Sequence, residues 1–251
     1  MFLDNLLPSG LAVLAAPHAV WHRITNPKKV SFGLLANLYA MRRRKEIIGI
    51  DSIWDIGANE GQFAFMAHTV WPELPIYSFE PDPICFGKLD GTFKEFSISG
   101  RTFPCALGSE KITKSLIRYS ESVNNSFLQR VDVKQDEQVK FEVQCATLDG
   151  VSEQIQWGRN AFLKLDVQGF ELNVLAGAVD FLKRCRYVQI EVSFASTYHS
   201  GANADEVLRF MREHGFQCVE ILDLLRNKQA GTRDITEVDL LFRHTKNDGC
   251  L

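Results

Sequence analysis

The sequence predicts an α/β domain with a mostly parallel sheet, an antiparallel strand at its end and a β-hairpin insertion. Apolar strand-like segments alternate with helical patterns from residue 52 onward, which is typical of a parallel sheet with right-handed crossovers. The last two strand-like segments have no convincing helix between them, which indicates an antiparallel pair. Residues 109–147 interrupt this alternation, and a chain of 251 residues suits one large domain with an added N-terminal element.

The expected elements follow each other in a simple order. Strands are expected at 53–56, 75–79, 101–107, 161–167 and 187–192, followed by the final pair at 216–222 and 238–242. Helices are expected after Gly61, from Ile84 to Phe96, after Gly169, and between a capping box at Asn203 and Glu206 and a stop at Gly215.

The interruption at about 109–147 is predicted to be a β-insertion. Residues 112–119 and 139–145 alternate with period two, which is typical of half-exposed antiparallel strands. A polar segment, 120–137, connects them. Since excursions of this length in a compact domain are usually functional, we expect the insertion to close over a substrate.

Residues 1–45 are predicted to form a helical extension ahead of a main domain at 46–251. Ser31 could cap a helix that ends near Arg44 in a basic run. The apolar segment 1–20 lacks a positively charged start and is too short to span a bilayer. A helical cap packed on the domain is the favoured interpretation, and peripheral membrane contact is the alternative.

Charge and cysteine content narrow the possible partners and the compartment. The net charge of −3 argues against nucleic acid as the main partner, because binding phosphate needs a basic surface. Six cysteines are spread along the chain without a C-x-x-C pair, and several fall in apolar patterns. This favours free thiols and a cytoplasmic location. The sequence gives no signal for the oligomeric state.

The segment 52–62 (SIWDIGANEGQ) is the most informative stretch of the chain. A short apolar strand ends at Asp55, Gly57 and Gly61 follow, and a helical pattern begins at once. Such a turn lets backbone N–H groups approach a ligand closely. It departs from the dinucleotide pattern G-x-G-x-x-G, and the acid would repel a pyrophosphate. A ligand with positive charge fits better, and S-adenosylmethionine, with its sulfonium and ammonium groups, is the obvious candidate.

Several segments together resemble the FkbM family of S-adenosylmethionine-dependent methyltransferases. The resemblance covers roughly residues 50–245 and rests on WDIGANEGQF (54–63), FEPDP (79–83), ALG (106–108), TLD (147–149), LKLDVQGFE (163–171) and EVS (191–193). It implies a Rossmann-like class I methyltransferase fold with a seven-stranded sheet, and methyl transfer to a hydroxyl of a sugar or secondary metabolite.

The resemblance also implies a cofactor site. The first turn would hold the methionine end of the cofactor, Glu80 would accept hydrogen bonds from the ribose hydroxyls, and Ala106 and Leu107 would flank the adenine. In dinucleotide-binding folds, an acid about 20 residues after the first turn likewise accepts a hydrogen bond from the ribose. The full set of expected cofactor-binding residues is Asp55, Gly57, Ala58, Asn59, Gly61, Gln62, Phe63, Glu80, Pro81, Asp82, Ala106, Leu107 and Asp166.

The catalytic candidates are Asp166, Glu191 and His199. Asp166 and Glu191 are expected at the carboxyl ends of neighbouring parallel strands, which border the ligand crevice in an open sheet. One carboxylate could remove the proton of the acceptor hydroxyl and the other could anchor the substrate, in an order left open. His199 is the one histidine near this predicted site, and a surface-loop position is its alternative. Lys164 is expected to pair with Asp166.

Three alternatives remain open at this point. Two carboxylates could bind a divalent metal, but no third ligand stands out, so no metal is expected. A nicotinamide oxidoreductase on a similar fold is disfavoured by the missing glycine pattern. A non-catalytic binding or scaffold module is the third possibility. The favoured interpretation is O-methylation of a small-molecule acceptor, a carbohydrate or a natural-product intermediate.

Overall fold

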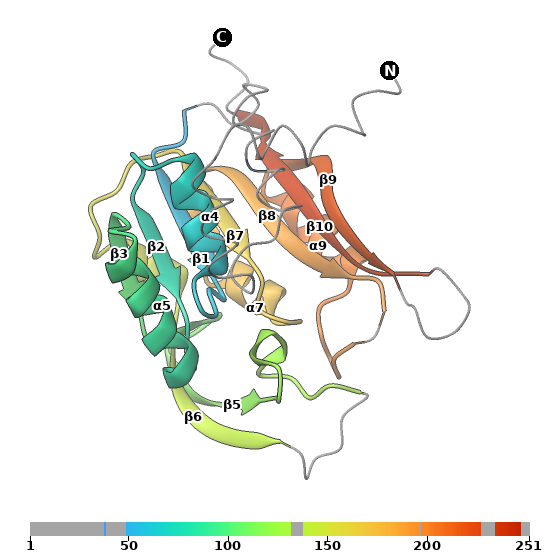
Figure 1. Cartoon of the computed structure of the whole chain (residues 1–251). Helices are drawn as coiled ribbons and strands as arrows, with labels where there is room; N and C mark the ends of the chain where they lie inside the picture. The colour runs from blue at the N-terminus through green and yellow to red at the C-terminus, as the bar shows by residue number, and fades with distance from the viewer. Residues whose placement is uncertain (1–37, 39–48, 132–137, 196, 227–233, 247–251) are drawn as a thin grey trace.

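The structure, a computed structural model, describes residues 38, 49–131, 138–195, 197–226 and 234–246. Its centre is a seven-stranded sheet with the order β3-β2-β1-β7-β8-β10-β9 (Figure 1). The strands are β1 (Ser52–Ile56), β2 (Ile76–Phe79), β3 (Gly100–Phe103), β7 (Ala161–Leu165), β8 (Cys185–Ser193), β9 (Phe216–Arg226) and β10 (Ile235–His244).

The strand directions agree with the sequence prediction. β1 pairs in parallel with β2 and β7, β7 pairs in parallel with β8, and β10 is antiparallel to both β8 and β9. Every residue of β1 and β7 is buried, as expected for central strands covered on both faces. The predicted fold class, a mostly parallel seven-stranded sheet with an antiparallel last strand, is confirmed.

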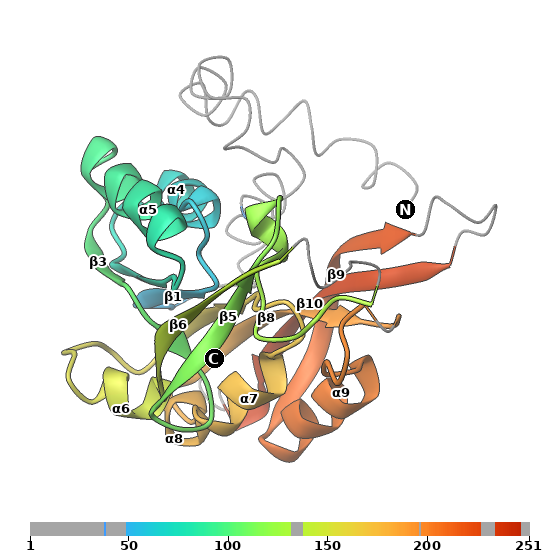
Figure 2. The ribbon, with the colours of Figure 1, turned by 90° about the horizontal axis from the view of Figure 1, so that it is seen from below.

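Helices cover both faces of the sheet, as Figure 2 shows. On one face lie α4 (Gln62–Val70) and α5 (Pro83–Glu95), and on the other lie α6 (Leu148–Ser152), α7 (Glu171–Ala176), α8 (Val179–Leu182) and α9 (Ala204–Glu213). Two apolar cores result, because neighbouring residues of one strand point to opposite faces. Ile53 belongs to the core under α4 and α5, and Trp54 belongs to the core under α7 to α9.

The insertion forms a second, three-stranded sheet in the order β4-β6-β5. β5 (Ile112–Arg118) and β6 (Val139–Ala146) are antiparallel, as predicted, and a short 3-10 helix, η1 (Ser122–Asn124), follows β5. Ala106 and Leu107 form β4 and pair with β6, so they do not continue β3. The expected strand 101–107 is therefore divided between the two sheets.

Three other expectations need adjustment. The helix expected after Gly169 is divided into α7 and α8, with the break at Gly177. There a Cβ atom would lie 2.0 Å from the carbonyl oxygen of Gly108. The final strands extend to Arg226 and from Ile235, further into the expected loop than predicted. Apart from Leu38, which is helical, the expected helix at 31–44 and the extension 1–45 lie outside the described residues, so that boundary stays a prediction.

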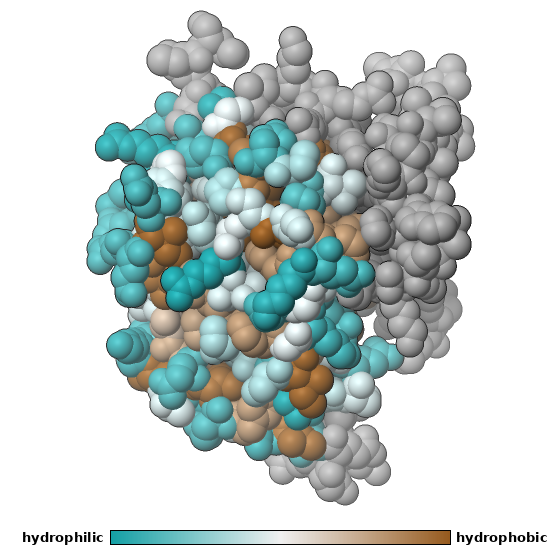
Figure 3. All heavy atoms as spheres, turned by 60° about the vertical axis from the view of Figure 1, so that its left-hand side comes forward, coloured by the Kyte–Doolittle hydropathy of each residue, from teal (hydrophilic) through white to brown (hydrophobic). Residues whose placement is uncertain are grey.

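The part of the chain that the structure describes contains no helix that is long and apolar enough to cross a membrane. On the face shown in Figure 3, apolar side chains form small groups among hydrophilic ones.

Candidate active site

A cavity of about 510 Å³ lies at the carboxyl ends of the parallel strands, under the insertion. An open α/β sheet places its ligand crevice at this edge. The cavity is lined by most of the predicted cofactor residues, namely Gly57, Ala58, Asn59, Gln62, Phe63, Glu80, Pro81, Ala106, Leu107 and Asp166. Glu191 lines it as well. The structure thus brings these side chains together, while their individual roles stay predictions.

The turn between β1 and α4 brings backbone close to the cavity. Gly57 and Gly61 have positive φ angles of 79° and 86°, and Asn59 also has a positive φ of 49°. A Cβ atom on Gly57 would lie 1.9 Å from the carbonyl oxygen of Asp166, so only glycine allows this turn to pass the end of β7. Gly61 precedes α4 and does not line the cavity.

Glu80 lies directly after β2 and faces the cavity. One carboxylate oxygen accepts a hydrogen bond from the backbone N–H of Asn59 at 2.9 Å, and the other accepts from Asp82 N–H at 2.8 Å. Each oxygen keeps a lone pair for a further donor. Burial raises the pKa of Glu80 to about 7, although the two N–H groups act against that shift. A buried acid with fixed geometry suits recognition of two neighbouring hydroxyl groups.

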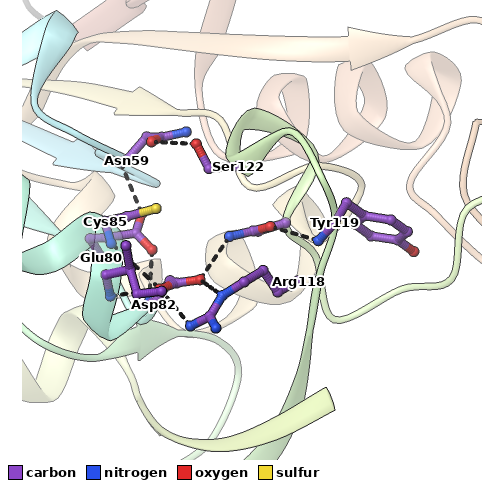
Figure 4. Close-up of polar contacts among 9 residues, drawn as sticks. Asn59, Glu80, Asp82, Cys85, Arg118, Tyr119 and Ser122 are labelled. Atoms are coloured by element: carbon purple, nitrogen blue, oxygen red, sulfur yellow. Dashed lines mark hydrogen bonds and ion pairs between the residues drawn. The ribbon is translucent and has the colours of Figure 1, made fainter. Parts of the chain in front are cut away.

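Asp82 binds protein groups, in contrast to the prediction that it contacts the cofactor. Its carboxylate caps α5 and accepts two hydrogen bonds from the Arg118 guanidinium, from Nε at 2.5 Å and from Nη2 at 2.8 Å (Figure 4). The Asn125 side chain donates to the same carboxylate at 3.0 Å. Asp82 is 1% exposed and does not line the cavity. It therefore connects α5 to the insertion.

A second contact joins the insertion to the first turn. The Ser122 hydroxyl donates to the Asn59 side-chain oxygen at 3.1 Å (Figure 4). The two attachments, Asp82 to Arg118 and Asn59 to Ser122, hold η1 beside the cavity, which Ser122 also lines. The position agrees with the prediction that the insertion closes over a substrate.

Asp55 is fully buried and forms an ion pair behind the cavity wall. The Lys164 ammonium lies 3.4 Å from Asp55 and 3.2 Å from Asp166. Burial raises the pKa of Asp55, and Lys164 acts against that shift. The sequence predicts that Asp55 attracts the ammonium of the cofactor either directly or through water. Lys164 lines the cavity whereas Asp55 does not, so this geometry does not support the direct contact. The predicted pairing of Lys164 with Asp166 is present.

The side-chain amide of Gln168 bridges the two catalytic candidates. Its Nε2 group donates to Asp166 at 2.9 Å and to Glu191 at 3.0 Å. Its Oε1 atom accepts from the Tyr198 hydroxyl at 2.8 Å, which fixes the amide orientation. Gln168 has a positive φ of 55°, so it marks a constrained turn after β7. This bridge sets the relative position of the two carboxylates.

The surroundings of Glu191 favour its protonated form. Burial raises the pKa of Glu191 well above its usual value, and the nearby carboxylates Asp166, Glu237 and Asp239 add to the shift. Asp239 is the neighbour of Glu191 across the β8–β10 pair, and its own pKa is raised to about 6, mainly by burial. A carboxyl with a raised pKa is a stronger base in its deprotonated form than an ordinary glutamate.

His199 is not part of the cavity. His199 lies in the loop after β8, and its side chain is exposed. Its backbone N–H donates to the carbonyl of Gln129 in the insertion. The surface-loop alternative fits this position, so the structure gives no support for a catalytic role.

Several cavity residues were not identified from the sequence. Glu237 comes from β10, Phe127 and Ser122 come from the insertion, and Tyr198 holds Gln168 from behind. Glu237, Phe127 and Ser122 are far along the chain from the motifs, whereas Tyr198 follows the EVS motif by five residues. No local pattern identifies any of the four. Among the described residues, no group of three His, Cys, Asp or Glu side chains is arranged to hold a metal ion.

The sheet order, the antiparallel β10 and the cavity position define a class I methyltransferase fold. The family model described as the methyltransferase FkbM domain matches residues 55–218. The chain therefore belongs to the FkbM methyltransferase family, which confirms the predicted enzyme class over the oxidoreductase alternative.

Similar proteins share moderate identity with this chain. The 31-O-demethyl-FK506 methyltransferase FkbM of Streptomyces tacrolimicus is 24% identical over 211 residues, covering 74% of this chain and 80% of the relative. The hexuronic acid methyltransferase AglP of Haloferax volcanii is 24% identical over 166 residues, covering 65% of this chain and 62% of the relative. The solved magnesium protoporphyrin IX methyltransferase ChlM from Synechocystis PCC 6803, with bound SAM, has a TM-score of 0.47 at 8% identity, covering 90% of this chain and 81% of that one.

Proposed function

We propose that this protein transfers a methyl group from S-adenosylmethionine to a hydroxyl of a small acceptor, a carbohydrate or a natural-product intermediate. The observation that carries the proposal is the pairing, in one cavity, of the fixed carboxylate Glu80 with the bridged carboxylates Asp166 and Glu191. The relatives named for O-demethyl-FK506 and hexuronic acid support this class of acceptor.

The cavity chemistry fits the donor. Glu80 can accept hydrogen bonds from two ribose hydroxyls through its remaining lone pairs. The carboxylate of Asp166 in the cavity wall favours the positive charge of an ammonium or sulfonium group and disfavours a pyrophosphate. Apolar groups from β4 and the insertion, including Leu107 and Phe127, offer a surface for a flat base. The donor, when bound, supplies an electrophilic methyl group.

The protein's own contribution to the reaction is positioning and proton transfer. We assign the role of general base to the deprotonated form of Glu191, which lies beside Asp166 through the Gln168 bridge and whose proton affinity is raised by burial and by its carboxylate neighbours. It would accept the hydroxyl proton as the methyl group passes to the acceptor oxygen and its bond to the donor sulfur breaks, which leaves S-adenosylhomocysteine as the second product. Gln168 keeps Glu191 and Asp166 in register for this step. Orienting the two reactants supplies a further share of the rate enhancement.

We also propose that the protein works in a reducing compartment such as the cytoplasm. Five cysteines of the described residues are free thiols, and three of them, Cys85, Cys145 and Cys185, are buried.

A methyl-transfer screen tests the proposal. Labelled S-adenosylmethionine is incubated with the protein and a panel of sugars, glycolipids and polyketide-like alcohols. We expect label in at least one hydroxyl-bearing acceptor. The turnover of a Glu191→Gln variant should be lower than that of wild type by a factor of about 10²–10⁴. Glu153→Gln, which changes an exposed carboxylate, is the matched control. Full turnover by Glu191→Gln would move the proton transfer to another group.

A further inference from the structure

A second, smaller cavity lies directly beside the first. Its volume is about 190 Å³, and it lies between the turn after β7, the end of β8 and the loop leading to α9. Gln168, Glu191 and Glu237 line both cavities. A group held in the smaller cavity therefore meets the larger cavity at Glu191, Glu237 and the side-chain amide of Gln168.

The wall of the second cavity combines polar groups with two aromatic residues, the buried Tyr198 and the exposed Phe194. The polar residues Ser193, Thr197, Ser200 and Asn203 contribute to it. Phe194 also lines it and is 59% exposed, unusually high for a phenylalanine. The Phe194 backbone N–H donates to the Thr236 carbonyl at 2.8 Å, which fixes the residue beside β10.

This combination suits a small polyhydroxylated ring. An aromatic face takes up the C–H side of such a ring, while polar groups and carboxylates accept its hydroxyls. The cavity is smaller than the ~300–1,000 Å³ of sites for drug-sized ligands, so it suits one ring better than a macrocycle.

The charged residues of the wall further restrict the class of acceptor. Glu171, Glu191 and Glu237 line the cavity, and none of the described lining residues is Lys, Arg or His. The guanidinium of Arg130 lies 5.9 Å from the Tyr198 ring centroid, but Arg130 does not line the cavity. A carboxylate on the acceptor would therefore lie among acidic side chains, with no cationic side chain among the lining residues to pair with it.

Resting on the proposed function, we infer that the second cavity is the acceptor subsite, that it holds one neutral sugar ring against Phe194, and that it disfavours uronates. The reacting hydroxyl points from this subsite toward Glu191, at the wall that both cavities share.

Ligand-observed saturation-transfer NMR tests the inference on the full chain saturated with S-adenosylhomocysteine. The probes are the methyl glycosides of glucose and galactose and their matched uronates. Calorimetric binding of S-adenosylhomocysteine is measured first, since its absence would overturn the proposed function itself. With the cofactor product bound, we expect saturation transfer to at least one neutral glycoside and weaker transfer to its uronate.

Two variants and one control locate the binding. Phe194→Ala should weaken binding of the neutral glycoside by about five- to tenfold, from the loss of an aromatic contact, and leave S-adenosylhomocysteine affinity unchanged. Glu237→Gln should reduce the discrimination against the uronate. Ile221→Ala removes a comparably exposed apolar side chain from β9, outside both cavities, and should change nothing.

Three results would overturn the inference while leaving the proposed function intact. They are cofactor binding without binding of any neutral glycoside, a preference for the uronates, and wild-type glycoside binding by Phe194→Ala.

Discussion

The Arg118 guanidinium forms two hydrogen bonds with the buried carboxylate of Asp82, 36 positions earlier in the chain. One residue belongs to β5 of the insertion and the other caps α5 beside Glu80. The Asp82 N–H itself donates to Glu80. Asp82 therefore both anchors the insertion and helps to position Glu80, the proposed ribose-binding carboxylate.

Removing the guanidinium should loosen the insertion and weaken cofactor binding. Arg118→Met leaves the Asp82 carboxylate, which is 1% exposed, without its charged partner. We expect the free energy of unfolding to fall by about 1–3 kcal/mol and S-adenosylhomocysteine affinity to fall by about tenfold. Urea denaturation and calorimetry measure the two effects. Arg209→Met, at an exposed position on α9, serves as the control, and unchanged affinity in Arg118→Met would separate the insertion from the cofactor site.

The buried pair of Lys164 and Asp55 should behave as one unit. Lys164→Met leaves Asp55, which is 0% exposed, as an uncompensated charge, and breaking such a pair costs about 3–5 kcal/mol. Adding Asp55→Asn should recover a large part of that loss, because the fully buried Asp55 charge is then removed together with its partner, and only the more exposed Asp166 loses its contact with Lys164. Urea denaturation of the four proteins measures the coupling. Additive losses would contradict the pairing.

Glu80 should make the ligand-free protein less stable as the pH rises. Its folded pKa of about 7 lies above its ordinary value of 4.5, so the folded state binds more protons between these two values. The stability that Glu80 contributes is complete below its unfolded pKa and is lost as the pH rises through about 7. Glu80→Gln should therefore become less destabilising, relative to wild type, from pH 5 to about pH 7.

Thermal unfolding of both proteins across this range measures the effect. Comparing wild type with the variant cancels the contributions of His68 and His244, whose pKa values are lowered by burial and which act in the opposite direction. A constant difference across this pH range would mean that Glu80 does not titrate as described.

Loss of the Gln168 bridge should affect turnover more than binding. Gln168→Met removes the donor that holds Asp166 and Glu191 together, and small losses of alignment can cost about 10²-fold in rate. We expect kcat to fall by at least about tenfold and the cofactor Kd to change little. Because Gln168 positions the proposed base, the pH dependence of kcat should also shift. An unchanged pH profile with normal kcat would remove Gln168 from the positioning role.

The elements that the sequence predicted well are those with strong local signals. β1 and β7 are mostly apolar runs, and the Asn203–Glu206 capping box begins α9 as expected. The cavity was predictable because glycine-bearing turns and strand-end acids fall at one edge of a parallel sheet. Long-range pairing was not predictable. Nothing near Arg118 points to Asp82, and nothing near Ala106 indicates that it leaves the main sheet to pair with β6.

The predicted site residues that do not line the cavity have the same explanation. Asp55 and Asp82 carry the acid that a ligand contact needs, but Lys164 and Arg118 neutralise them inside the protein. His199 is close to the site in sequence, but the loop after β8 directs it to the surface. Composition and spacing identify the residue types at a site. The fold decides which of them face the cavity.

Calorimetric titration of wild type and Glu80→Gln with S-adenosylhomocysteine tests the central claim most directly. The account predicts binding by wild type in the micromolar range typical of KM values, and binding at least about tenfold weaker in Glu80→Gln, from the loss of a hydrogen bond to a charged group. Absence of both heat and thermal stabilisation with wild type, or equal affinity of the two proteins, would contradict it.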